Sequence, residues 1–429
     1  MKPLSLISKS TSFSLLAAIL LAAVLASTSG CKKKPVLPPA PSTPAQIAAA
    51  SPLSANASHG KELLEQFQCN RCHDGIGIEP APQGKHCVRC HADIVTGIFK
   101  APSTSLTKWR PRVEDLNAAP SLEALGARYS QEWVEAYLLH PRDLRPGLPN
   151  GMPRLDLTPE DARDLAAYLV RGASEPVPPI GPEDADMGKG REILDTKGCG
   201  NCHKFTGVAA VAFSPLPVSL RPGDFAIGAR LAPDLRVTRE RFSYPRLLQW
   251  LLDPRSVKPD TRMPKVFLSN EEARDLAQYI LKAELAPLPE PVLPKRLPLL
   301  DRPVTYKEVD KRVFHRTCWH CHSEPDYAIG DGGPGNSGGF GFKPRGLNLS
   351  DYNGISAGVL EKGSTSKRIS VFAPMSDGTP RIIKVLMQRH AEVAGAPPGE
   401  VRGMPLAYPP LPLEDIQLLE TWIAQGRPR

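Results

Sequence analysis

Apolar residues recur at helical spacing in several short stretches of the chain, and each stretch predicts an amphipathic helix. The clearest is residues 413–425, where Ile416, Leu419, Trp422 and Ile423 fall on one face. Two earlier stretches each end before a proline, as expected because the residue before a proline disfavours the helical conformation. Their apolar positions are Trp133, Tyr137 and Leu138 before Pro141, and Leu247, Trp250 and Leu251 before Pro254.

Two further helices are predicted by their N-terminal capping sequences, Thr158–Asp161 and Ser269–Glu272. Both continue as Ala-Arg-Asp-Leu-Ala and reach a tyrosine sixteen residues after a Met-Pro pair. Shorter matches precede them: Gly60-Lys-Glu-Leu-Leu is echoed by Gly190-Arg-Glu-Ile-Leu, and Ala119-Pro-Ser-Leu by Ala232-Pro-Asp-Leu. The shared order of these elements indicates an internal repeat.

Proline-rich stretches separate the repeats from each other and from the rest of the chain. Residues 173–184 and 285–303 are both rich in proline, which is typical of linkers. They predict three domains, at residues 46–173, 184–284 and 304–429.

Residues 1–30 have the composition of a signal peptide. Lys2 and Lys9 form a basic start, and an apolar run of about 14 residues follows, which is short for a membrane span. Small residues then lead to Cys31, an order that resembles a bacterial lipoprotein processing site, although Thr28 stands where leucine is usual. The resemblance implies a lipidated Cys31 and a proline-rich stalk over 31–45; the alternative is an uncleaved helix with an unmodified Cys31. Both place the mature chain on the periplasmic side of the cell envelope, attached to one of its membranes.

Four Cys-x-x-Cys-His motifs use eight of the nine cysteines. The cysteine pairs are Cys69 and Cys72, Cys87 and Cys90, Cys199 and Cys202, and Cys318 and Cys321; the histidines are His73, His91, His203 and His322. This spacing is typical of c-type haem attachment, in which two thiols bond to one haem and the following histidine binds its iron. Zinc sites and redox dithiols are the alternatives, but neither requires the histidine four times. The motifs therefore predict four haem c groups, each with its iron.

Composition and charge agree with haem as part of each core. The chain has 41 % hydrophobic but only 6 % aromatic residues and contains 47 prolines, so small domains would bury little apolar surface without the cofactor. The formal charge is +8, of which Lys2 and Lys9 would leave with the signal peptide. Four haems would add about eight propionate carboxylates, which roughly offsets the remainder. The basic charge therefore gives no argument for a nucleic-acid partner.

These residues together resemble the small single-haem cytochrome c family. Its pattern is a first helix leading into the haem motif, a Met-Pro on a loop, and a final helix packed across the first. The likeness covers residues 59–171, 187–283 and 306–427. It implies an all-α fold of three tandem cytochrome c-like domains around covalent haems, and it implies that Met152, Met263 and Met404 are the sixth ligands of three irons.

The first domain departs from the pattern, since it holds two haem motifs and one such methionine. The second motif, at Cys87, has the character of an insertion. Its iron has three candidate ligands, His59, His86 and His140, or an open position; His59 is preferred. His315, His320 and His390 are interpreted as polar or packing residues.

The expected activity is electron transfer rather than catalysis, with redox proteins of the cell envelope as partners and the lipid anchor as the membrane contact. Two alternatives remain. A peroxidase or small-molecule reductase would need an open iron at the Cys87 site and acid–base groups near it, for which no motif is seen. A haem subunit of a larger respiratory complex is the other.

Overall fold

The computed structural model describes residues 54–142, 144–145, 151–155, 157–215, 221–323, 346–361, 364–396, 399–406 and 408–429, all within one compact unit, Ser42–Arg429. The predicted signal peptide, Cys31 and the stalk lie outside the described residues. Among the helices of the described residues, none combines the length and apolar character that a membrane span needs. Three segments of this unit have the bounds of the predicted domains: the first (46–173), the second (184–284) and the third (304–429).

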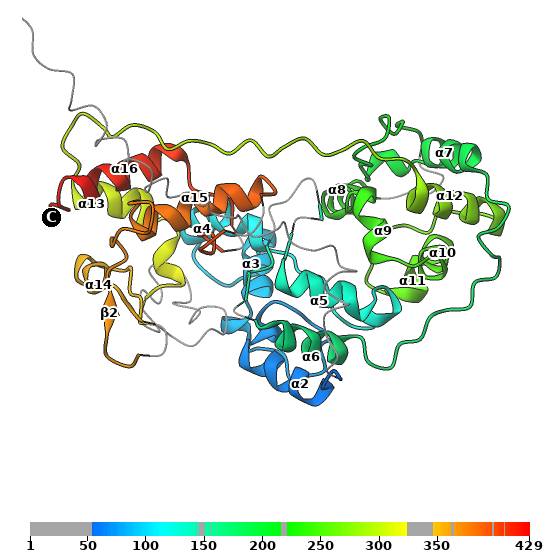
Figure 1. Ribbon diagram of the computed structural model, residues 1–429, viewed down its shortest axis with the longest axis horizontal. Coiled ribbons are helices and arrows are strands. Elements are labelled where there is room, and N and C mark those ends of the chain that lie inside the picture. The colour runs from blue at the N-terminus through cyan, green and yellow to red at the C-terminus, as the bar shows by residue number, and fades with distance from the viewer. Residues whose placement is uncertain are drawn as a thin grey trace, which may run out of the picture. The chain divides into compact units, whose positions relative to one another are not determined.

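The described residues are almost entirely helical (Figure 1). The first segment contains α2 (Ala57–Gln66), η1 (Cys69–Arg71), η2 (Gln83–Lys85), α3 (Cys87–Thr96), α4 (Ser103–Val113), η3 (Glu114–Leu116), η4 (Leu125–Ala127), α5 (Gln131–Leu139) and α6 (Pro159–Leu169). The second contains α7 (Met187–Thr196), η5 (Cys199–Asn201), α8 (Pro222–Leu231), η6 (Leu235–Val237), α9 (Thr238–Arg241), α10 (Tyr244–Leu252), α11 (Pro254–Val257) and α12 (Asn270–Lys282). The third contains α13 (Tyr306–Val309), the π-helical turn η7 (Asp310–Phe314), η8 (Cys318–His320), α14 (Tyr352–Ala357), β1 (Val359–Leu360), β2 (Arg368–Ile369), α15 (Arg381–Val393) and α16 (Leu413–Ala424).

The helix ends predicted from capping residues are confirmed. The Thr158 side chain accepts from the Asp161 N–H while the Asp161 carboxylate accepts from the Thr158 N–H, which is a complete capping box for α6. Ser269 and Glu272 do the same for α12. Helices α5 and α10 also end where predicted, two residues before Pro141 and Pro254. The local sequence therefore decides where these helices begin and end.

The repeat forms two helix crossings, one of α2 on α6 and one of α7 on α12. In Figure 1 the two helices of each crossing are neighbours. A Cβ added at Gly60 would lie 2.1 Å from the Asp164 carbonyl oxygen, and one added at Gly190 would lie 2.3 Å from that of Asp275. Both distances are far below van der Waals contact. Glycine therefore allows the first helix of each repeat to approach the backbone of the last.

The buried aspartates of the repeated Ala-Arg-Asp-Leu-Ala sequence hold the same crossings together. Asp164 accepts a 2.7 Å hydrogen bond from the Asn56 N–H, at the N-cap of α2. Asp275 accepts a 3.1 Å bond from the N–H of Asp186, the N-cap of α7. Each carboxylate therefore satisfies a backbone donor at the start of the helix that crosses it.

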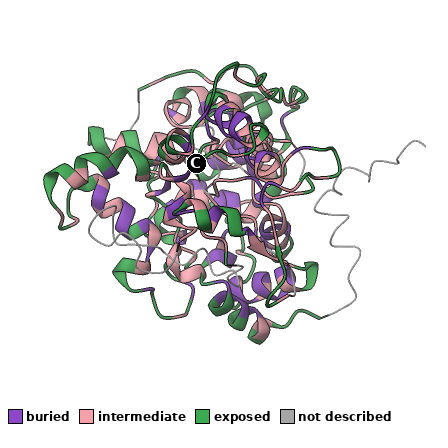
Figure 2. Cartoon of the chain, turned by 90° about the vertical axis from the view of Figure 1, so that its left-hand side faces the viewer, coloured by how far each residue is buried: buried purple, intermediate pink, exposed green. Residues whose placement is uncertain are grey.

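The apolar residues gather in three main clusters, one in each segment, and Figure 2 shows buried residues concentrated on the inner faces of the helices. Leu64 and Leu165 are fully buried in the first cluster, Leu248 and Leu276 in the second, and Trp422 in the third. Phe242 packs against both the first and the second cluster. The clusters fit the predicted three-domain division, which remains a prediction.

The structure also contains features that the sequence pattern does not predict. Helices α3 and α4 pack together around a small core of their own, with Ile94 and Trp109 buried. In the third segment, Val359 and Leu360 pair antiparallel with Ile369 and Arg368 in a two-stranded ladder. The first helix there is only one turn long before it becomes the π-helical turn.

We expect His59 to stabilise the fold in a pH-dependent way. Its Nδ1 lies 2.8 Å from the Asp164 carboxylate, and this hydrogen bond raises the pKa of His59 above its usual 6.5. The contribution should be fully present below about pH 6.5 and be lost as pH rises through the folded-state pKa. Denaturant midpoints of wild type and His59→Ala should therefore differ more at pH 5.5 than at pH 9.

An Asp164→Asn background is the control, because the same histidine substitution there should give a pH-independent difference. A difference that does not vary with pH in the wild-type background would contradict the ion pair. The same variants test the sequence prediction that His59 binds iron, since loss of an iron ligand would change the haem spectrum at every pH.

Candidate haem sites

Three of the four Cys-x-x-Cys-His motifs have the same backbone turn. Each first cysteine begins a 3₁₀ turn, η1, η5 or η8, and its carbonyl accepts from the N–H of the motif histidine. The N···O distances are 3.0 Å to His73, 2.9 Å to His203 and 3.0 Å to His322. Two thiols and one imidazole therefore leave the same short turn in each case, as attachment to one haem requires.

The second motif differs, because it lies within helix α3. His86 is the N-cap of this helix, and its Nδ1 accepts a 3.2 Å bond from the Arg89 N–H. The His86 side chain is only 1 % exposed. Arg89 in turn forms a 2.6 Å ion pair with Asp74. His86, a sequence candidate for the iron ligand, thus uses one ring nitrogen to start the helix that carries the motif.

The motif histidines are oriented by backbone carbonyls. Nδ1 of His73 donates to the Pro120 carbonyl at 2.8 Å, and Nδ1 of His203 donates to that of Pro233 at 2.8 Å. His91 donates in the same way to Leu116, at 2.9 Å. A carbonyl can only accept, so the proton is on Nδ1 and Nε2 is left to bind a metal.

Sequence reasoning did not identify these carbonyls, although a signal for two of them was present. Pro120 and Pro233 are the prolines of the repeated Ala-Pro-x-Leu sequence. The repeat is therefore explained by the need to place one carbonyl beside each histidine. Leu116, at the end of η3, has no such sequence signal.

Burial keeps the four histidines neutral, which is the state that binds iron. It lowers the pKa of His91 and of His322 to about 4, and it lowers those of His73 and His203 as well. Burial also raises the pKa of four thiols, to about 12 for Cys69 and Cys318 and to about 11 for Cys90 and Cys199. An apolar site of this kind suits a haem and a thioether bond.

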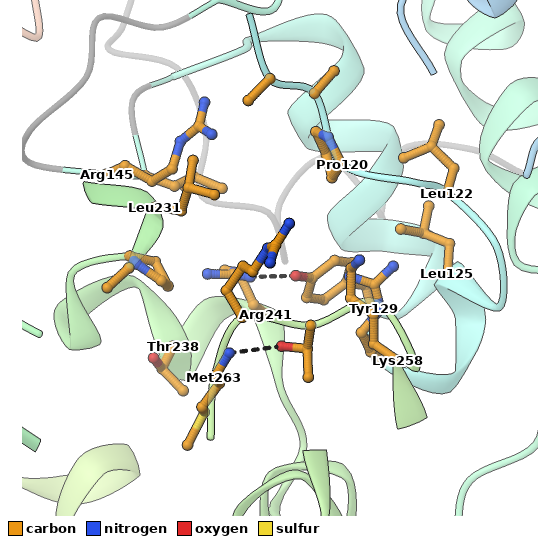
Figure 3. Close-up of a pocket in the computed structure, with 18 of the residues that line it drawn as sticks. Pro120, Leu122, Leu125, Tyr129, Arg145, Leu231, Thr238, Arg241, Lys258 and Met263 are labelled. Carbon is orange, nitrogen blue, oxygen red and sulfur yellow. Dashed lines mark hydrogen bonds between the residues drawn. The ribbon is translucent and has the colours of Figure 1, made fainter. Parts of the chain in front are cut away.

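The first and third motifs open into one cavity of about 710 Å³ (Figure 3). The motif residues in its wall are Cys69, Cys72 and His73 from the first segment and Cys199, Cys202 and His203 from the second. Met152 and Met263 line the same cavity, as the resemblance predicts for sixth ligands. The Met263 sulfur accepts a 2.9 Å hydrogen bond from Trp250 Nε1. The Met263 backbone N–H donates to Thr261 Oγ1 at 3.2 Å.

Two buried arginines, Arg128 and Arg241, line this cavity. Arg241, 9 % exposed, donates to the Tyr129 hydroxyl (Figure 3), and its guanidinium carbon lies 4.8 Å from the centre of that ring. Burial alone would raise the pKa of Tyr129, but the charges of Arg241 and Arg128 lower it overall. The Nε atoms of both arginines are buried without a hydrogen-bond partner.

These buried donors fit the propionates of haem. An unpaired buried guanidinium N–H costs free energy unless an acceptor reaches it, and a carboxylate is the acceptor it binds best. The wall offers apolar side chains for the ring, histidine and methionine for the iron, and arginine for the acid groups. Arg241 and Arg128 are therefore functional candidates that no motif had identified.

The second motif lies beside the first, and Tyr408 of the third segment packs near both. The hydrogen bond with Cys87, together with burial, raises the pKa of Cys72, so the thiols of the first two motifs lie next to each other. Tyr408 packs against the small cluster of Val88 and Leu116, as Cys72 does. Burial raises the pKa of Tyr408, and so do the nearby Cys321 and Cys87. Met404 packs against the third hydrophobic cluster, and its N–H donates to the Val385 carbonyl at 2.9 Å.

The remaining histidine candidates have other surroundings. His59 is bonded to Asp164 at the start of α2. His140 is the C-cap of α5; its Nδ1 is buried without a partner, and burial lowers its pKa. The iron ligands predicted from the sequence, His59 and the three methionines included, remain predictions.

Comparison with known proteins agrees with the class of site described above, a covalent haem site in a small helical domain. Residues 57–172 match the sequence model of the family described as cytochrome c. The match supports a c-type cytochrome, whose family binds covalently attached haem c with its iron and generally carries electrons. None of the curated proteins compared with the chain matches it.

Proposed function

We propose that this protein carries electrons through four covalently bound c-type haems on the periplasmic side of a bacterial cell envelope. It would exchange them with membrane or periplasmic redox proteins and be held at the membrane by a lipid on Cys31. The cytochrome c match at 57–172 supports haem-based electron transfer. The four haems, the location and the partners go beyond what that match supports and belong to the proposal.

One observation carries the proposal: the first and third motifs, with Met152 and Met263, face a common cavity. Haems held there would be neighbours rather than isolated groups. The contact between Cys72 and Cys87 brings the second motif beside the first, and Tyr408 lies near both of these thiols and near Cys321 of the fourth. The arrangement is that expected for a relay of electrons.

The residues present fit the cofactor, which when bound supplies the one-electron chemistry of its iron. Pro120 and Pro233 fix the tautomer and direction of His73 and His203 and strengthen the imidazoles as donors. Met152 and Met263 offer neutral, soft sulfurs, which favour the reduced state. Arg241 places a buried positive charge in the wall of the cavity that both motifs line, which favours anionic groups beside it.

Haem stoichiometry tests the proposal. Protein matured in a bacterial host able to attach haem c should contain four haems per chain in a pyridine haemochrome assay, and all should remain bound under denaturing conditions. Fewer than four in fully matured protein would contradict the count. A Cys199→Ala, Cys202→Ala double variant should lose one haem and retain the other three.

The ferric spectrum distinguishes electron transfer from catalysis. Filled axial positions keep iron low-spin and require little rearrangement between oxidation states. A carrier should therefore show little high-spin iron and bind little cyanide. A high-spin fraction near one quarter, with cyanide or peroxide binding, would favour the enzyme alternative at the Cys87 site.

A further inference from the structure

In the structure His320 lies close to His91, the histidine of the motif at Cys87. The sequence had left the second axial ligand of that motif's iron undecided. The ring centres of His91 and His320 lie 6.4 Å apart, with 39° between the ring planes. His91 is in α3 of the first segment, whereas His320 is in η8, inside the fourth motif. The sequence pattern had favoured a polar or packing role for His320.

The separation matches that of two imidazoles on opposite sides of one metal. An imidazole nitrogen binds a first-row metal at about 2 Å and lies about 1.15 Å from the centre of its own ring, so two opposite rings have centres about 6.3 Å apart. The observed distance is 6.4 Å. Two such rings turn independently about the axis through the metal, so the angle of 39° is compatible with this arrangement.

The surroundings of His91 leave one nitrogen atom for a metal, and those of His320 fix the direction of its ring. The Nδ1 atom of His91 donates to the Leu116 carbonyl, so Nε2 is its free ligand atom. Trp319 packs edge-on against His320, with centres 5.6 Å apart and an angle of 84°. Trp319 is itself held by a 3.2 Å bond from Nε1 to the His315 carbonyl. The orientation of His320 is therefore set by a neighbour that is anchored in its own turn.

The position of His320 in its motif allows this second role. Attachment of the fourth haem uses Cys318, Cys321 and His322, and the two residues between the cysteines are variable. Tyr408, whose ring centre lies 6.5 Å from that of His91, packs on the same small apolar cluster. This cluster, with Val88 and Leu116 buried in it, would help to keep water from the metal.

We propose that His320 is the second axial ligand of the iron bound by His91. The inference rests on the proposed function, because it requires a haem at Cys87 and Cys90. It replaces His59 as the candidate and closes the position that a peroxidase would need open. It also makes the attachment turn of the fourth haem a direct ligand of the second, so the two redox centres would be joined through a few covalent bonds.

Electron paramagnetic resonance and near-infrared magnetic circular dichroism test the assignment on the full matured protein. Wild type should show one haem in four with bis-imidazole ligation. His320→Ala should convert that haem to a high-spin, cyanide-binding form while the haem count stays at four, and added imidazole should restore the low-spin signal. His320→Met should instead give an additional methionine-to-iron band and a higher midpoint potential for that haem.

Matched variants separate this ligand from its rivals. His390→Ala is the control, because the Nε2 atom of His390 donates to the Leu411 carbonyl in the third segment, and it should leave the haem spectrum unchanged. An unchanged bis-imidazole signal in both His320 variants would overturn the proposal, as would loss of that signal in His59→Ala. A wild-type haem count below four would instead count against the proposed function.

Discussion

Replacing Met263 with alanine should lower the midpoint potential of one haem by on the order of 100 mV or more. A thioether sulfur is neutral and soft, so it stabilises ferrous iron relative to ferric iron. Without it, water or hydroxide would take the position, and these harder oxygen ligands favour the ferric state. Met263 lies in the wall of the cavity that the Cys199 motif also lines, as required of a ligand to that haem. A spectroelectrochemical titration should show one centre shifted, and the ferric spectrum should lose one methionine-to-iron band.

Met152→Ala should have the same effect on a different haem, since Met152 lines the cavity with the Cys69 motif. The double variant should lose two such bands. Met187→Ala is the matched control, because that methionine is 38 % exposed at the start of α7 and should leave every potential unchanged. Unaltered spectra in Met152→Ala and Met263→Ala would show that these methionines are packing residues.

Gly190→Ala should destabilise the protein by about 2–3 kcal/mol, the usual cost of forcing an atom into a packed interface. The new Cβ would lie 2.3 Å from the Asp275 carbonyl oxygen and 2.7 Å from the Tyr279 Cβ. Neither neighbour is the end of a flexible side chain, so α7 and α12 would have to move apart. The guanidinium midpoint, followed by far-ultraviolet circular dichroism, should fall accordingly.

Gly223→Ala gives the comparison, because it makes the same substitution in helix α8, where no atom lies within 4 Å of the added carbon. Alanine is the better helix former, so this variant should be neutral or slightly more stable. If Gly190→Ala and Gly223→Ala had equal midpoints, the close helix crossing would not be what requires glycine at position 190.

The repeated sequences predict much of the local structure, as α6 and α12 illustrate. Thr158 and Ser269 cap these helices as expected, because a capping box depends only on residues three apart. The second motif is the contrasting case. Its Cys-x-x-Cys-His spacing equals that of the other three, yet it lies in an α-helix capped by His86, whose side chain the sequence had offered as an iron ligand.

The sequence by itself determined the number and spacing of the cysteine–histidine motifs, the ends of the main helices, and the glycine and aspartate positions that recur with them. All of these depend on neighbours within a few residues, where bond geometry and local hydrogen bonds decide the outcome. Only the tertiary structure decided which carbonyls orient His73, His91 and His203. It also decided that Met152 and Met263 share a cavity and that His320 lies beside His91. Those relations join residues far apart in the chain, and their distances are set by how the helices pack, which the order of residue types does not specify.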